Sequence, residues 1–248
     1  MDYNSRYAQI MKIVFLGTPS FVQPIKQELA KHFTLVDSLN EADLCVVAAY
    51  GRILTKKELN TPKYGCINVH PSLLPKYRGP SPIQQAILNG DKVTGITIIK
   101  MDEEVDHGPI IYQERLDLSD MDNFDILSKK MFQRAADILP NIIRNFISGK
   151  LKPHRQNHPK GSFCPRLTRD SGYFPIDNLP AGRQVPHFQK KLDKMIRAYY
   201  PWPGVWTRWQ GKIVKFLPGG LLQMEGKKPI SYKDFQNGYP DFPLRYSS

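Results

Sequence analysis

The chain has 248 residues, of which 41% are hydrophobic and 23% charged, a balance typical of a globular protein with one main core and a smaller appended unit. No stretch approaches the roughly 18 consecutive apolar residues that cross a bilayer, and residues 1–9 lack the apolar core of a secretion signal, so we expect a soluble, cytoplasmic protein. The three cysteines, Cys45, Cys66 and Cys164, form no Cys-x-x-Cys pair, which argues against a disulfide framework and against a four-thiolate zinc site.

The net charge of +12 is unevenly distributed along the chain. Residues 150–216 contain 14 Lys and Arg against three Asp, a net +11, whereas residues 1–149 carry 17 charges of each sign. A neutral body followed by a basic segment suits a polyanionic partner such as a nucleic acid. A solvated basic surface that only keeps the protein soluble is the alternative, and charge alone leaves both open.

The first half of the chain alternates apolar runs with helical patterns. Residues 11–16 are a continuous apolar run that ends at Gly17, which predicts a strand buried on both faces. A helix capped by Ser20 follows over 21–32, and further buried strands are predicted at 43–49 and 66–70. This order of strand, helix and strand predicts a parallel α/β sheet. The remaining predicted elements are a helix at 80–89, strands at 94–101 and 110–116, and a long amphipathic helix at 123–148.

The second half changes character. Residues 152–186 are rich in Pro, Gly and charge with weak periodicity, which indicates a linker along the surface. A helix is predicted at 188–200, stopped by Pro201 and Pro203, and the alternating, turn-rich remainder predicts a small β domain. We therefore expect three parts, with boundaries at 1–160 for the main domain, 161–175 for a linker and 176–248 for the β domain.

Three polar side chains suggest a reactive site. Asn68 and His70 lie two apart on a predicted strand, so they point to the same side near its carboxyl end, where open α/β sheets hold their ligands. Asp106 lies in a loop between two strands that could return to meet them. An amide, an imidazole and a carboxylate together suit acyl transfer, with donors for an oxyanion and a group that moves a proton. The alternative is a strand end that caps its own turn, with a solvated aspartate elsewhere.

Several segments resemble the folate-dependent formyltransferases. The longest is Asn68-x-His-x-Ser-Leu-Leu-Pro-x-x-Arg-Gly79, followed downstream by Asp106-x-Gly108. Shorter segments at 17–21 and 49–54 match in the same order, and 196–206 and 225–235 resemble the C-terminal domain of those members that act on charged tRNA. The resemblance covers most of the chain. It implies a Rossmann-like formyltransferase domain with a small, truncated C-terminal domain of β-barrel (OB-like) type.

The resemblance also implies roles for individual residues. Asn68 and His70 would hydrogen-bond the formyl oxygen, and Asp106 would orient His70, favour its charged form and help a water carry the amine proton. The donor would be 10-formyltetrahydrofolate, bound without a metal. Its pterin and formyl ends would lie along three segments, whose residues are Arg52, Ile53, Leu54, Ser72, Leu73, Leu74, Pro75, Met101, Asp102 and Val105.

The implied acceptor is the amine of initiator methionyl-tRNA, and we expect the protein to be a monomer. The alternative acceptor, with the same chemistry, is a nucleotide-linked amino sugar. A catalytically idle RNA-binding relative is the third hypothesis, which the presence of all three site residues disfavours. The sequence departs from the family pattern at three places: a basic loop expected after Val36 is missing, the β domain is shortened between Phe216 and Leu221, and residues 178–186 are an insertion.

Other motifs have simpler explanations. Gly17-Thr-Pro lacks the glycine spacing of a dinucleotide site and is better explained as a turn. A zinc site formed by His154, His158 and Cys164 would lack a fourth ligand. The three tryptophans, Trp202, Trp206 and Trp209, could stack on a nucleic acid end, but they are more simply the core of the β domain.

Overall fold

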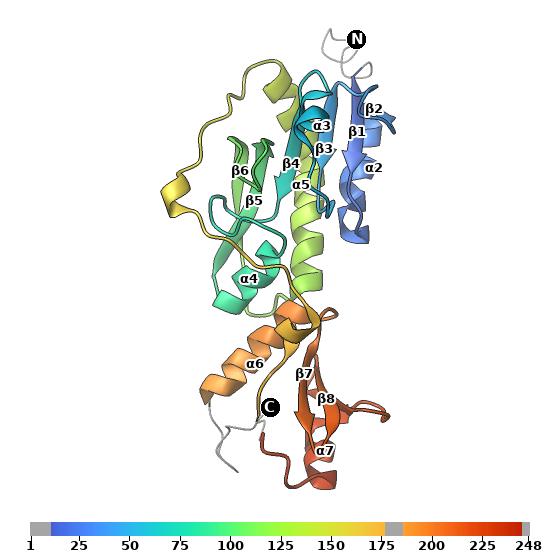
Figure 1. Ribbon diagram of the computed structural model, residues 1–248, viewed down its shortest axis with the longest axis vertical. Coiled ribbons are helices and arrows are strands. Elements are labelled where there is room, and N and C mark those ends of the chain that lie inside the picture. Colours follow the sequence, from blue (N-terminus) through green and yellow to red (C-terminus); the bar gives the residue numbers. More distant parts are fainter. Residues whose placement is uncertain (1–10, 177–185, 245–248) are drawn as a thin grey trace. The chain divides into compact units, whose positions relative to one another are not determined.

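The computed structural model describes residues 11–176 and 186–244, and the chain folds into two compact units (Figure 1). The first unit comprises Met1–Ile83, Lys92–Ser119 and Ile126–Pro165, and the second Gln84–Asp91, Asp120–Asp125 and Arg166–Ser248. The predicted boundaries at residues 160 and 176 stay a prediction. In the described parts of the chain no helix is long and apolar enough to cross a membrane.

A six-stranded sheet forms the centre of the first unit. Its strands are β1 (Lys12–Leu16), β2 (Thr34–Val36), β3 (Leu44–Val47), β4 (Cys66–His70), β5 (Val93–Lys100) and β6 (Ile110–Asp117), in the order β2-β1-β3-β4-β5-β6. The first four strands are parallel, while β5 is antiparallel to β4 and β6 to β5. The predicted Rossmann-like class is confirmed, but the sheet is mixed rather than wholly parallel. The loop between β5 and β6 is shorter than the dozen or so residues that a parallel crossover needs.

Helices accompany this sheet. They are the short η1 (Ser20–Val22), α2 (Gln23–His32), α3 (Lys56–Asn60) and α5 (Phe124–Ile147), whereas most of α4 (Pro82–Asn89) belongs to the second unit. Phe21, at the start of the first helical segment, stacks on Phe132 of α5 with ring centroids 5.2 Å apart. Arg144 of α5 lies over the ring of Phe33, just beyond α2. The first helix of the unit and the long helix α5 therefore pack against each other.

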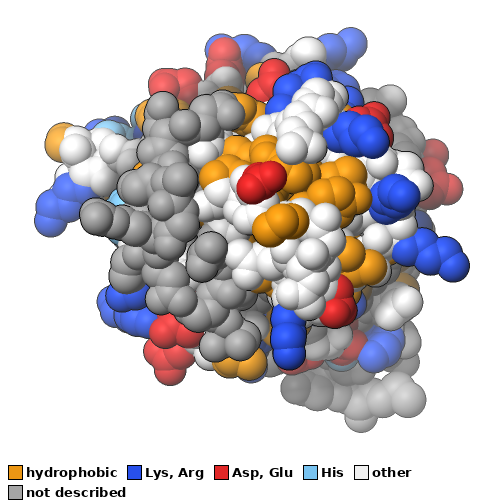
Figure 2. Space-filling model, turned by 90° about the horizontal axis from the view of Figure 1, so that it is seen from below, with side chains coloured by type: hydrophobic (Ala, Val, Ile, Leu, Met, Phe, Trp, Pro, Cys, Tyr) orange, Lys and Arg blue, Asp and Glu red, His pale blue; other side chains and the backbone are white. Residues whose placement is uncertain are grey.

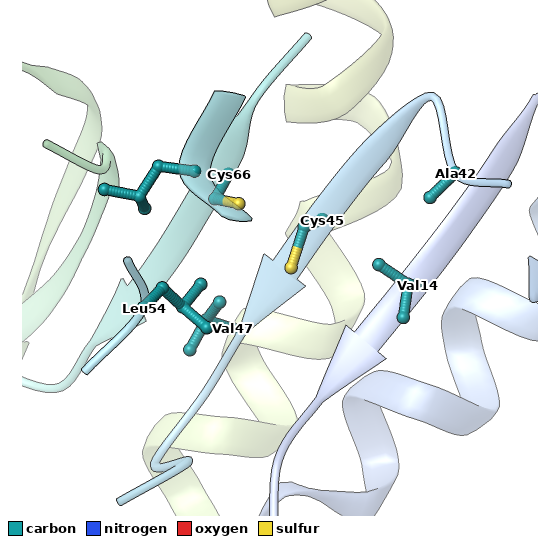
Figure 3. Close-up of a cluster of buried hydrophobic side chains, with 7 residues drawn as sticks. Val14, Ala42, Cys45, Val47, Leu54 and Cys66 are labelled. Carbon is teal, nitrogen blue, oxygen red and sulfur yellow. The ribbon is translucent and has the colours of Figure 1, made fainter. Parts of the chain in front are cut away.

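A cluster of buried side chains joins β1, β3 and β4 to the region of α3 (Figure 3). Its members are Val14, Ala42, Cys45, Val47, Leu54, Leu59 and Cys66. Cys45 and Cys66 are register partners on β3 and β4, and both are free thiols. A hydrogen bond with Cys66 and burial raise the pKa of the Cys45 thiol. The pair therefore behaves as part of the apolar core rather than as a nucleophile or metal ligand.

The connection from β2 to β3 is unusually short. Only residues 37–43 join these two strands, although both are parallel to β1 and lie on opposite sides of it. Parallel strands usually need a connection of a dozen or more residues. The absence of the basic loop expected after Val36 thus leaves a connection with no helix in it.

The second unit contains a four-stranded antiparallel sheet in the order β10-β9-β8-β7. Its elements include α6 (Pro186–Tyr199), β7 (Val205–Trp209), β8 (Lys212–Leu217), β9 (Leu221–Met224), β10 (Ile230–Ser231) and α7 (Tyr232–Gly238). Trp209 packs edge-on against Tyr239 and Phe242. Trp206 donates its indole hydrogen to the Arg169 carbonyl at 3.0 Å, whereas Trp202 is 57% exposed. Two of the three tryptophans, Trp206 and Trp209, therefore belong to the packing of this unit. The insertion predicted at 178–186 lies outside the described residues, apart from the backbone of Pro186 at the start of α6.

One buried hydroxyl shapes the turn after β4. Thr97 of β5 is fully buried; it donates to the Ser72 carbonyl at 2.6 Å and accepts from the Leu74 amide at 3.1 Å. Gln113 of β6 donates both to Thr97 Oγ1 and to the Leu74 carbonyl, each at 2.9 Å. The turn that carries Ser-Leu-Leu-Pro is thereby fixed to the two antiparallel strands.

Two substitutions of the same kind should separate this role from simple burial. Thr97→Val preserves shape but leaves the Ser72 carbonyl and the Leu74 amide without their partner, so it should lower the free energy of unfolding by about 1–3 kcal/mol. Thr207 of β7 is equally buried, but its hydroxyl has no hydrogen-bond partner, so Thr207→Val should be neutral or stabilise by up to about 1 kcal/mol. Urea unfolding measures both, and equal effects of the two variants would contradict this account.

Candidate active site

Strand β4 positions two of the three predicted site residues. Cys66–His70 alternates between the two faces of the sheet, so Asn68 and His70 share one face. Asn68 is partly exposed, whereas His70, the last residue of the strand, is only 3% exposed. The strand therefore presents an amide at an accessible point and an imidazole beneath the surface.

Asp106 reaches these two side chains from the loop between β5 and β6. Its Oδ1 accepts from Asn68 Nδ2 at 3.1 Å and lies 3.5 Å from His70 Nδ1. Its Oδ2 accepts from the backbone amide of Gly79 at 2.8 Å. The carboxylate thus joins the other two predicted site residues, and it is held by Gly79, which the sequence motif contains but to which no role was assigned.

The other nitrogen of His70 defines its tautomer. Nε2 lies 2.9 Å from the carbonyl oxygen of Tyr77, which can only accept, so Nε2 carries the hydrogen and donates. In the neutral ring Nδ1 is then a lone-pair acceptor beside Asp106. Only the doubly protonated ring can donate from Nδ1. This nitrogen is therefore the one that can exchange a proton within the site.

These groups have complementary chemical abilities. The Asn68 amide is a preorganised donor of the kind that stabilises a developing oxyanion, and it is oriented by the Asp106 carboxylate. His70 Nδ1 can take up or return a proton, and Asp106 can accept hydrogen bonds from it or from a water. The arrangement suits attack of an amine on an acyl carbon.

The turn after β4 is mostly used for its own structure. Ser72 is fully buried and donates from Oγ to the Lys76 carbonyl at 2.6 Å. Leu74 is buried in a small cluster with Ile99 and Ile110. Leu73 and Pro75 remain partly exposed. Of this predicted segment, these two are the side chains still available to a ligand.

The remaining predicted ligand residues lie on two segments that share one cluster. Leu54 is buried in the cluster of Figure 3, and Met101 packs against that cluster. Ile53 is 71% exposed and Val105 46% exposed, which is high for aliphatic side chains. Next to them, a groove of about 520 Å³ is lined by Leu59, Asn60, Met101, Asp102, Glu103 and Glu104.

Arg52 is held in place by an ion pair. Its two terminal nitrogens bond to the carboxylate oxygens of Glu58 at 3.0 and 2.7 Å. This pairing, with hydrogen bonds from Thr55, lowers the pKa of Glu58 to about 2. Thr55 and Glu58 also form the capping box that starts α3. The Arg52 side chain is therefore committed to α3, which leaves its backbone for the role that the resemblance implies.

Three further residues surround Asp106. Arg78 and Gly79 end the longest motif in the sequence but were given no role there, and Gln156 lies in the stretch that we predicted as a surface linker. Gln156 Nε2 donates to the carbonyls of Asp106 and Gly108 at 2.9 and 2.7 Å. No local signal marks this residue, because its partners lie about 50 residues earlier in the chain.

The zinc alternative gains no support. The described residues contain no group of three or more His, Cys, Asp or Glu placed to hold a metal. His158 stacks on His107 with ring centroids 4.0 Å apart. Cys164 is buried, which raises the pKa of its thiol, and its Sγ donates to the Arg78 carbonyl at 3.1 Å.

The tautomer of His70 can be measured directly. In spectra of the ¹⁵N-labelled protein, neutral His70 should show a slowly exchanging proton on Nε2, because that nitrogen is buried and bonded to the Tyr77 carbonyl. The exposed ring of His187 is the control and should show no such resonance. A ring proton on Nδ1 of neutral His70 would rule out the geometry described here.

Comparison with known proteins identifies the family of the chain. The family model described as formyl transferase matches residues 19–143. A methionyl-tRNA formyltransferase of Kosmotoga olearia is 40% identical over 83% of this chain and 62% of its own length. One from Roseiflexus castenholzii is 40% identical over 90% of this chain and 78% of its own length. For the first three such relatives, the chain spans between 53% and 63% of their length.

A solved structure supports the fold. HypX from Aquifex aeolicus, crystallised in complex with tetrahydrofolic acid, superposes with a TM-score of 0.70 at 15% identity, over 97% of this chain and 50% of that chain. At this level of identity the likeness shows the fold alone. The family match and the two relatives carry the assignment further: the chain belongs to the formyl transferase family.

Proposed function

We propose that this protein transfers a formyl group from 10-formyltetrahydrofolate to the amine of initiator methionyl-tRNA. The observation that carries the proposal is that Asn68 and His70 both face the Asp106 carboxylate. They do so in a chain whose relatives are named methionyl-tRNA formyltransferases. A cytoplasmic location, where charged tRNA is used, and a monomeric state belong to the same proposal.

The reaction assigns each group a step. The amine nitrogen attacks the formyl carbon, and the carbonyl oxygen becomes an oxyanion that accepts a hydrogen bond from Asn68 Nδ2. The bond between the formyl carbon and N10 of the folate then breaks, and tetrahydrofolate leaves. One proton passes from the amine to N10, with His70 Nδ1 and a water bonded to Asp106 as its carriers. When Nδ1 holds that proton, it can also donate to the oxyanion.

The residues present fit a folate donor. Ile53 and Val105 leave aliphatic surface exposed on the two segments expected to flank the pterin, and apolar surface of this kind suits the faces of a flat heterocycle. Polar backbone in the same segments suits its edges. The HypX structure, which has this fold, is named as a complex with tetrahydrofolic acid, in line with a folate-type donor here.

The charge of the second half favours tRNA over an amino sugar as acceptor. Residues 150–216 carry a net +11, and Figure 2 shows Lys and Arg side chains standing around an apolar patch on one face of the molecule. Within the second unit, Lys190, Lys191 and Lys194 of α6 line a groove of about 500 Å³ whose other lining includes Leu88, Met195 and Tyr199. A nucleotide sugar needs a small pocket rather than an extended cationic face.

One assay tests the proposal. Purified protein is offered 10-formyltetrahydrofolate with charged initiator tRNA in one reaction and with a set of nucleotide-linked amino sugars in another. Formylation of methionyl-tRNA alone supports the proposal. Formylation of a sugar alone would show that the protein is an amino-sugar formyltransferase. No transfer to either acceptor would contradict the proposal that the protein is a formyltransferase.

Asp106 provides the first kinetic prediction. Asp106→Asn keeps the shape and tolerates the left-handed backbone (φ 50°) as well as Asp does, but it removes the charge beside His70. Turnover should fall by roughly 100-fold or more, while the variant still folds with only a small drop in the unfolding midpoint, because its single amide oxygen can accept from only one of the two donors, Asn68 Nδ2 and the Gly79 amide. Asp117→Asn, at an exposed position at the end of β6, is the matched control and should turn over normally. Near-normal turnover of Asp106→Asn would show that the Asp106 charge is not needed for proton transfer and would contradict the role assigned to it.

The lysines of α6 provide a second prediction, on tRNA binding. Changing Lys190, Lys191 and Lys194 together to Ala keeps helix propensity but removes three charges, so the slope of log affinity for tRNA against log salt should become shallower by about two to three units. Turnover at limiting methionyl-tRNA should collapse, whereas transfer to a small surrogate amine should persist because the site residues are untouched.

The matched control replaces three exposed lysines of the first unit, Lys26, Lys57 and Lys63, and should leave the salt slope nearly unchanged. If the α6 variant binds tRNA with wild-type affinity and slope, this helix is not the tRNA surface. If both triple variants weaken binding equally, the interaction follows total charge rather than a defined face.

A further inference from the structure

The loop that carries Asp106 follows a constrained path. Asp106 has φ 50°, in the left-handed region that residues with a side chain seldom adopt without support from their surroundings. Two residues later, a side chain at Gly108 would overlap the carbonyl group of Lys100. Register explains the difficulty: β5 ends at Lys100 opposite Ile67, so the loop must fold back along β4 to reach Asn68 and His70. Such a loop needs bonds from outside itself.

Gln156 supplies those bonds. It is 5% exposed, and its Nε2 donates to the carbonyls of Asp106 and Gly108, on either side of His107. Its Oε1 accepts from Arg78 at 2.7 Å. Two carbonyls can only accept and a guanidinium can only donate, so the orientation of the amide is unambiguous and both of its N–H donors are used.

Arg78 connects the Gln156 amide to the segment that holds the Asp106 carboxylate, because Arg78 bonds to Gln156 and the next residue, Gly79, bonds to Asp106. Its side chain is 5% exposed and donates to Gln156 and to His158 Nδ1, the latter at 2.8 Å. Arg78 can only donate, so His158 Nδ1 is the acceptor of this bond. Loss of hydration and the nearby charges of His107 and Arg78 lower the pKa of His158, in line with a ring that accepts here. The next residue, Gly79, donates its amide to Asp106 Oδ2. A side chain at Gly79 would press on the Cys164 carbonyl at 2.7 Å.

We infer that Gln156 is a positioning residue for the reaction: anchored by Arg78, it fixes the backbone of Asp106 so that the carboxylate meets Asn68 and His70. The inference rests on the proposed function, since the reaction it serves is the one proposed above. Gln156 itself touches carbonyl groups of the loop and acts through Asp106. Small displacements of such a group are costly, since about 1 Å can reduce a rate by roughly 100-fold.

The test uses a substitution that removes two of the three described hydrogen bonds of Gln156 and keeps the third. Gln156→Glu has the same shape and still accepts from Arg78, but it cannot donate to the two carbonyls. Turnover should fall by about 10- to 100-fold, while KM for 10-formyltetrahydrofolate changes by less than about threefold. Gln27→Glu, an exposed change on α2, is the matched control and should behave as wild type.

A double substitution distinguishes positioning from a general structural role. In the Asp106→Asn background, Gln156→Glu should lower turnover by less than about threefold more, because both changes act on the same group. The same fold loss in both backgrounds would overturn the inference, as would wild-type turnover of the single variant. Should Gln156→Glu fail to fold, Gln156→Asn keeps the amide but is one methylene too short to reach, and the same expectations apply.

Hydrogen exchange separates this inference from the proposed function. Backbone amides of residues 103–108 should exchange faster in Gln156→Glu than in Gln27→Glu, whatever reaction the site performs. If the wild type transfers no formyl group but this exchange difference is found, the function is wrong and the restraint on the loop is real. Unchanged exchange together with unchanged turnover would overturn the restraint itself.

Discussion

The Asp106 carboxylate is the point on which the rest of the site depends, because two other segments of the chain, β4 and the turn at Gly79, meet at its two oxygens. Oδ1 faces Asn68 and His70 of β4, and Oδ2 is held by the Gly79 amide. Without that carboxylate, the Asn68 amide would lose its orienting partner and His70 its only acidic neighbour described here. The antiparallel direction of β5 makes the meeting difficult, since it delivers the loop toward the beginning of β4.

The sequence predicted those parts of the site that lie on one strand. Asn68 and His70 were recognisable because side chains two apart share a face, and a continuous apolar run marks β4 as buried. The direction of β5 was not recognisable, because a strand buried on both faces has the same apolar pattern whichever way it runs. Gln156 was missed for a related reason: its partners are fixed by folding, not by spacing along the chain.

Other differences have local causes. Strand β2 has only three residues, too few for any period, whereas Thr55 and Glu58 carry a readable capping box that predicts α3 and was overlooked. The stretch predicted as a surface linker is partly engaged with the first unit: His154 bridges to Ile110, and Phe163 to Arg78. This stretch lacks periodicity because its backbone bonds to other elements and forms no regular helix or strand of its own. We therefore mistook weak periodicity for a lack of contact with the first unit.

The short connection after β2 takes no part in the described contacts of the candidate site. The sheet order places β1 and β3 between β2 and β4, so β2 lies three strand spacings from the strand that carries Asn68 and His70, about 14 Å away. The described contacts of Asp106 come from β4, from Gly79 and from Gln156, and none of them comes from residues 37–43. Under the proposed function, a polyanionic acceptor would therefore be bound by the basic residues beyond Lys150, while the supports of Asn68, His70 and Asp106 are unaffected by the short connection.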